Sequence, residues 1–134
     1  MTATVPAGFF IRTPQTIAVA EAASIGVSAG ACGAVTQGTS KTTAVTLSTK
    51  AGVITMHAAA LASVTAVKFV QTNTACSATD VVICNQGGGG TSNAYRVEAC
   101  AQDGSIAYRV ENNTAGSLSE ALTINFIVID SQAG

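Results

Sequence analysis

The sequence predicts an all-β protein, a jelly-roll-like or related β-sandwich of about eight strands. Three observations predict it: short alternating apolar and polar runs at near-even spacing, turn residues between these runs, and a doubled pentapeptide around an Asp-Gly pair. Regular short strands separated by Gly, Asn, Asp or Ser are typical of sandwiches and jelly rolls. The apolar residues, 48% of the 134, are rich in Ala and Val, and only 4% of the chain is aromatic. Small and β-branched residues of this kind favour pleated sheets.

The clearest single element is a hairpin centred on Asp103 and Gly104. The pentapeptide Ala-Tyr-Arg-Val-Glu occurs twice in full, at 94–98 and again at 107–111. Asp-Gly between alternating runs favours a two-residue type I′ turn. Closing the chain there sets three pairs of residues opposite one another: Gln102 and Ser105, Ala99 and Tyr108, Val97 and Val110.

The charges of the repeated pentapeptide predict the same register. Arg96 falls opposite Glu111, and Glu98 falls opposite Arg109, which makes two complementary pairs on one face. A slip of two residues would place Arg96 opposite Arg109, and like charges across a ladder are destabilising. The two tyrosines of the repeat fall on the other face, which we expect to be the core.

Beyond residue 33 the strand signals follow one another regularly. We expect strands at 34–37, 43–48, 52–57, 64–71, 79–85, 93–101, 105–112 and 121–130. The last strand is apolar on both faces in its second half, which indicates a central strand or a subunit contact. Because residues 1–32 lack this regularity, we expect an N-terminal arm or edge segment there and a single sandwich domain over 33–134.

Charge is scarce along the chain. Only 10% of the residues are charged and the net charge is −1, whereas an ordinary soluble domain carries about 25% charged residues. A monomer so poor in charge would have difficulty staying in solution, so we expect other copies or a larger assembly to cover much of its surface. The charge predicts neither a nucleic-acid partner nor an anionic membrane. The N-terminal residues lack a signal-peptide pattern, which predicts synthesis in the cytoplasm.

The four cysteines, Cys32, Cys76, Cys84 and Cys100, lack the close pairs of a zinc site. If residues 86–91 join strands 79–85 and 93–101 as a hairpin, one register places Cys76 opposite Cys100, within reach of a disulfide. Free thiols are the simpler interpretation, because free cysteine behaves as a small hydrophobic residue. We expect free thiols and keep a Cys76–Cys100 bridge as the alternative.

No motif of an enzyme stands out. His57 has no Ser, Cys or Asp at the spacing of a catalytic triad, and nothing resembles a nucleophile elbow. The four glycines at 87–90 precede a strand and not a helix, which favours a hairpin tip over a phosphate-binding loop. We expect no enzymatic activity, no cofactor, no metal and no small-molecule substrate.

Several phrases between residue 33 and the end of the chain resemble one group of proteins. They are the stretches 34–47, 52–56, 58–61, 78–82 and 116–126. In these phrases the chain is similar to small virion structural proteins of tailed bacteriophages, and the similarity does not extend over residues 1–30. By analogy with other small β-rich virion proteins, the resemblance implies a capsid decoration or cement protein. Such proteins are often jelly-roll homotrimers, and the group offers no catalytic motif.

The resulting expectation is a structural virion protein that binds the outer surface of a phage capsid and stabilises it. Its expected partners are the major capsid protein and its own copies in a homotrimer, and its expected location is the capsid exterior. Phe9, Phe10 and Ile11, the apolar part of the arm, are the candidate capsid contact. The alternative is a tail-fibre or glycan-binding β-sandwich module, although the chain lacks the Trp that such sites often use.

Overall fold

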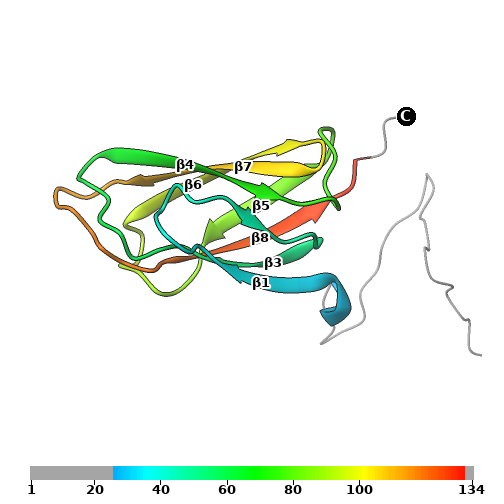
Figure 1. The fold of residues 1–134 in the computed structure, drawn as a ribbon, viewed down its shortest axis with the longest axis horizontal. Coiled ribbons are helices and arrows are strands. Elements are labelled where there is room, and N and C mark those ends of the chain that lie inside the picture. The colour runs from blue at the N-terminus through cyan, green and yellow to red at the C-terminus, as the bar shows by residue number, and fades with distance from the viewer. Residues whose placement is uncertain (1–25, 132–134) are drawn as a thin grey trace, which may run out of the picture.

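The protein, described by a computed structural model over residues 26–131, is built from two four-stranded sheets packed face to face (Figure 1). The sheets have the strand orders β1-β3-β8-β5 and β2-β4-β7-β6. After a 3-10 turn at Ala29–Ala31, the strands are β1 (Cys32–Thr36), β2 (Val45–Thr46), β3 (Ala51–Thr55), β4 (Thr65–Thr72), β5 (Val81–Gln86), β6 (Tyr95–Gln102), β7 (Ser105–Asn112) and β8 (Thr123–Ile129). The predicted eight-stranded β-sandwich is confirmed.

Each predicted strand has a counterpart within a few residues, and β7 has the predicted bounds. β2 is much shorter than predicted, because only Val45 and Thr46 pair with β4. β8 lies between β3 and β5, so the last strand is central, as its apolar second half indicated.

The hairpin of β6 and β7 has the register that the sequence predicted. Gln102 faces Ser105, Val97 faces Val110 and Ala99 faces Tyr108. The turn itself differs from the prediction. Type I′ requires a positive φ at both central residues, but of the two only Gly104 has one, at +73°. Glycine therefore takes the left-handed position, and Asp103 does not.

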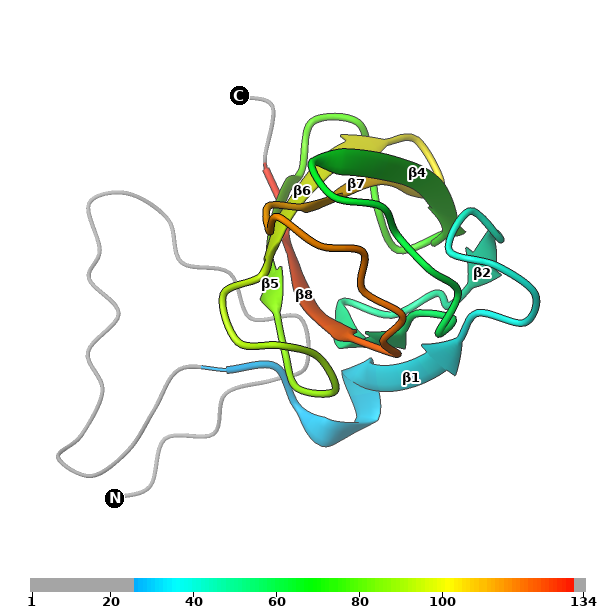
Figure 2. The same cartoon turned by 90° about the vertical axis from the view of Figure 1, so that its left-hand side faces the viewer.

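The chain changes sheet at every connection except the β6–β7 hairpin. Consequently β1 pairs with β3, and β2 with β4, in parallel. A jelly roll is an antiparallel architecture, so the structure matches the related β-sandwich and not the jelly roll itself. Figure 2 shows the two sheets from one end, with β5 beside β6 at one margin of the sandwich.

The predicted hairpin of strands 79–85 and 93–101 is wrong. β5 pairs with β8 in one sheet, while β6 pairs with β7 in the other. The glycine-rich stretch between them is therefore a crossover and not a hairpin tip. It first prolongs the β5–β8 ladder, since Gly87 N–H donates to the Thr123 carbonyl at 2.7 Å and Thr123 N–H donates to the Gly88 carbonyl at 2.9 Å.

The core lies between the sheets and includes both tyrosines of the repeat, as predicted. Tyr108 is 1% exposed, and its ring stacks on Phe69 with 5.0 Å between the centroids. Its hydroxyl donates to Gln71 Oε1 at 2.9 Å, and Gln71 Nε2 donates to the Leu47 carbonyl at 2.7 Å. Burial raises the pKa of Tyr108. This hydrogen-bond chain lets an aromatic residue with a polar end be buried without an unpaired group.

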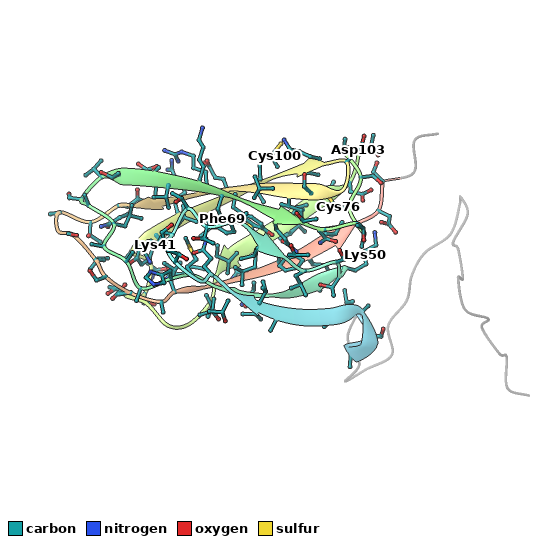
Figure 3. The ribbon with its side chains drawn as sticks, viewed as in Figure 1. Lys41, Lys50, Phe69, Cys76, Cys100 and Asp103 are labelled. Atoms are coloured by element: carbon teal, nitrogen blue, oxygen red, sulfur yellow. The ribbon has the colours of Figure 1, made fainter. Side chains whose placement is uncertain are left out.

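A buried lysine closes one end of the sandwich (Figure 3). Lys41 is 3% exposed, and its Nζ donates to the carbonyls of His57 at 2.5 Å and Glu120 at 2.6 Å. Gln37 Nε2 donates to the carbonyls of Lys41 and Thr43. Lys41 thus joins the β1–β2, β3–β4 and β7–β8 loops, and burial lowers its pKa. Lys41 was not among the residues that the sequence pattern predicted to be buried.

The side chain of Glu120 adds the β5–β6 loop to the same end. Its carboxylate accepts the Thr91 N–H at 2.9 Å, the Thr91 hydroxyl at 2.6 Å and the Tyr95 hydroxyl at 2.8 Å. These bonds lower the pKa of Glu120. Four loops that are distant in sequence therefore meet in one polar cluster.

At the opposite end of the sandwich, Lys50 also satisfies a backbone carbonyl of a loop. Its Nζ donates to the Ala75 carbonyl at 2.6 Å and pairs with the Asp130 carboxylate. Asp80 accepts the backbone N–H groups of Ser77 and Ser131. Charged groups at both ends thus satisfy backbone groups of the loops.

We expect Lys41→Met to lower the free energy of unfolding by about 2–3 kcal/mol, because it removes a charged donor from two carbonyls while keeping the length of the side chain. Chemical denaturation measures this. Lys68→Met, at an exposed strand position, is the matched control and should change stability by less than about 0.5 kcal/mol. Equal effects of the two substitutions would contradict the role given to Lys41.

We expect acid to weaken the Glu120 cluster. The pKa of Glu120 is lowered from its ordinary value of 4.5 in the folded state, so its stabilising effect is complete above that value and is lost as the pH falls through the folded pKa. Asp80 acts in the same direction, because the Ser77 and Ser131 amides lower its pKa. Urea unfolding between neutral and acid pH should show a steeper loss for the wild type than for Glu120→Gln. Identical pH profiles would contradict this.

Candidate docking surface

One outer face of the sandwich carries no charged side chain. Alternation along the strands of the β1-β3-β8-β5 sheet, with the observed register, places the following residues on its outer side: Cys32, Ala34 and Thr36 of β1; Ala51, Val53 and Thr55 of β3; Thr123, Asn125, Ile127 and Ile129 of β8; Val81, Ile83 and Asn85 of β5. We call this set the charge-free face.

Large apolar side chains gather on one part of the charge-free face. Val81 is 54% exposed, Ile83 is 53% exposed and Ile129 is 46% exposed. The register puts Val81 opposite Ile129, and Ile83 opposite Ile127, on the adjacent strands β5 and β8. Isolated exposed apolar residues are ordinary, but a contiguous group of this kind marks an interaction surface.

The outer side of the other sheet is charged. Its strands β4, β6 and β7 present Lys68, Arg96, Glu98, Arg109 and Glu111 on one side. We call this side the charged face. The two outer faces of the sandwich therefore differ in charge, although their strands have similar lengths.

The ion pairs of the charged face depart from the predicted ones. Arg109 Nη1 lies 2.7 Å from Glu111 Oε2 and 3.5 Å from Glu98 Oε2. Glu111 thus pairs with the arginine two residues before it on the same strand, and Arg96 forms no ion pair within residues 26–131. The register is confirmed, but the expected pair of Arg96 and Glu111 is wrong. Exposed pairs contribute at most about 1 kcal/mol each, so the core and the turn determine the register more than the charges do.

The charged face contains a hollow of about 670 Å³. Val70, Cys100 and Ala107 are among its lining residues, together with Lys68 and Arg109. The aromatic residues of the described chain, Phe69, Tyr95, Tyr108 and Phe126, are all at least 93% buried, since none is more than 7% exposed. The described surface therefore lacks the exposed ring on which a sugar or a base would stack.

All four cysteines are free thiols. Cys76 is 3% exposed in the loop before β5, while Cys100 is exposed on the outer side of β6, as Figure 3 shows. The alternative Cys76–Cys100 bridge depended on the hairpin that the sheet topology rules out. Burial raises the pKa of both Cys76 and Cys84, which lowers the reactivity of these two thiols.

The other candidate sites belong to loops. His57 follows β3, and its Nδ1 accepts the Ala59 N–H at 3.0 Å. Within residues 26–131, no group of three or more His, Cys, Asp and Glu residues is placed to hold a metal. No helix in the described part of the chain has the length and apolar character needed to cross a membrane. Phe9, Phe10 and Ile11 lie outside the described residues.

Comparison with protein-family models, with curated proteins and with solved structures finds no match for this chain. The charge-free face is therefore the feature of the molecule from which a function is inferred. One signal in the sequence pointed toward it, the apolar residues on both sides of the strand that became β8. The contribution of β5 was hidden by the wrong pairing, because the predicted hairpin joined this strand to the strand at 93–101 and not to β8.

We expect Cys100 to react with a thiol reagent in the native protein, and Cys76 and Cys84 to react only on unfolding. Intact-mass measurement and peptide mapping after brief labelling test this order. Denatured but unreduced protein should take up four labels. Two labels would show that a disulfide is present after all.

Proposed function

We propose that the protein is a structural virion protein of the capsid decoration or cement type, which binds the outer surface of a phage capsid and stabilises it. The observation that carries the proposal is the charge-free face with its exposed Val81, Ile83 and Ile129. A surface of this composition is stable when another protein surface covers it. The proposal therefore places the molecule in an assembly and requires no chemical reaction from it.

The resemblance of residues 33–134 to small virion proteins of tailed phages supplies the kind of assembly. A cement protein braces a shell by burying surface across the joints between capsomers, which requires area and shape complementarity. A closed homotrimer fits the low charge of the chain, since most soluble oligomers have closed symmetry. The proposed partners are the major capsid protein and other copies of this chain.

The N-terminal segment is the proposed capsid-binding arm, with Phe9, Phe10 and Ile11 as its anchor. The arm was expected over residues 1–32, but Cys32 already belongs to β1. An apolar anchor of this kind suits a contact that buries surface against another protein. This separates the two contacts that the proposal needs: the arm for the capsid and the sandwich for assembly of the protein itself.

A tail-fibre or glycan-binding module is the second candidate, because the hollow on the charged face is the size of a ligand site. The burial of every described aromatic residue speaks against it. A glycan array probed with the purified protein distinguishes the two, because specific glycan binding would favour the second candidate.

We expect the protein to co-purify with capsids in stoichiometric amounts, which quantitative mass spectrometry of purified particles measures. A few copies confined to the tail would contradict the capsid role.

We expect the triple substitution Phe9→Asp, Phe10→Asp and Ile11→Asp to abolish rebinding of the purified protein to capsids that lack it, while the native mass stays unchanged. Val64→Asp, at a position that is 72% exposed in the sandwich, is the control and should rebind normally. Normal rebinding of the triple variant would show that the capsid contact lies elsewhere.

A further inference from the structure

The charge-free face extends across all four strands of its sheet, and each of its residues is exposed or partly exposed. We propose that this face is the surface through which copies of the chain associate. The proposal deepens the homotrimer of the proposed function by assigning its contact surface. Its test uses the purified protein alone, so the self-contact and the capsid contact can fail independently.

The distribution of charge indicates which kind of surface binds the charge-free face. A charged partner surface would lose hydration against this face and find no opposite charge there, which is costly. The partner must therefore be as free of charge as the face itself. The charge-free face of a second copy has that chemistry, and it is present wherever the first copy is.

Symmetry also favours a second copy of the chain as the partner of the charge-free face. Near the axis of a closed homo-oligomer, identical side chains from different copies come together. On the charged face, such an arrangement would bring Arg109 toward Arg109 or Lys68 toward Lys68, and like charges in contact cost several kcal/mol. On the charge-free face, Val81, Ile83 and Ile129 can meet their own copies without repulsion.

The dimensions of the face predict the strength of the contact. Four strands about 4.8 Å apart, each five to seven residues long at about 3.3 Å per residue, span a flat area of roughly 400 Å². A standard stable interface buries about 800 Å² per partner. The face alone is therefore a small interface, and the association should reverse on dilution.

The free edge of the same sheet adds to this surface. β1 lies at the edge of the β1-β3-β8-β5 sheet, and its residues Cys32–Thr36 include neither a charge nor a proline. Natural proteins usually protect an edge strand with one of these. The edge strand β1 has neither feature and borders the charge-free face, so a second copy seated on the face can also cover this edge.

The test compares one substitution on the two faces. Val81→Lys changes a valine that is 54% exposed on the charge-free face, and Val70→Lys changes a valine that is 41% exposed on the charged face. Sedimentation velocity and native mass spectrometry over about 1–100 μM protein follow association. We expect the wild type and Val70→Lys to associate alike, and Val81→Lys to associate at least about tenfold more weakly, because each contact would bury an unpaired ammonium. Ile129→Lys should repeat the effect.

Circular dichroism and the midpoint of thermal unfolding show whether each variant is folded. A wild type that stays monomeric over the whole range would overturn the proposal, and so would equal weakening by Val70→Lys and Val81→Lys.

A chain that begins at residue 26 keeps the whole described core. It tests whether the N-terminal residues, and not the charge-free face, mediate association. If it no longer associates while Val81→Lys still does, the N-terminal residues mediate association and the proposal is wrong. If it associates like the full chain, the contact lies in the sandwich, as proposed.

Discussion

The two sheets of this sandwich are held together by the path of the chain, because every connection except the β6–β7 hairpin passes from one sheet to the other. The halves therefore cannot form separately, and every strand except β6 has a partner that is distant in sequence. Such long-range pairing is slow to form and depends on a well-packed interior. The stacked rings of Phe69 and Tyr108, with the hydrogen bond from Tyr108 to Gln71, are at the centre of that interior.

The crossing connections also explain where the few charges of the chain are found. Loops that pass over the ends of a sandwich leave backbone groups without ladder partners, and these must be satisfied. Lys41 and Glu120 satisfy them at one end, and Lys50 and Asp80 at the other. Apart from Asp103 and Asp130, the other charges of residues 26–131 lie on the charged face, and the charge-free face has none. A protein with 10% charged residues is in this way divided into a face suited to water and a face suited to another protein surface.

Local features were predictable where neighbours in sequence are neighbours in space. The β6–β7 register followed from the Asp-Gly pair and the repeat, and the strand positions followed from alternation. The partner of β5 was not predictable in this way. A hairpin of β5 with β6 was predicted because the two strands are consecutive in sequence. The observed pairing of β5 with β8 depends instead on which distant strand offers a matching apolar face. The site was partly visible in the apolar residues of β8, and the residues from β5 became visible only with the correct pairing.

The sequence by itself determined the all-β class, the approximate strands, the central hairpin and the inward position of Tyr95 and Tyr108, because each depends on alternation and turn residues within a short stretch. The tertiary structure decided the alternation of strands between sheets, the free state of Cys76 and Cys100, the burial of Lys41 and the existence of a face without charge. These depend on which distant segments meet. A side chain at an outward position becomes part of a continuous surface only when its neighbours on adjacent strands are known.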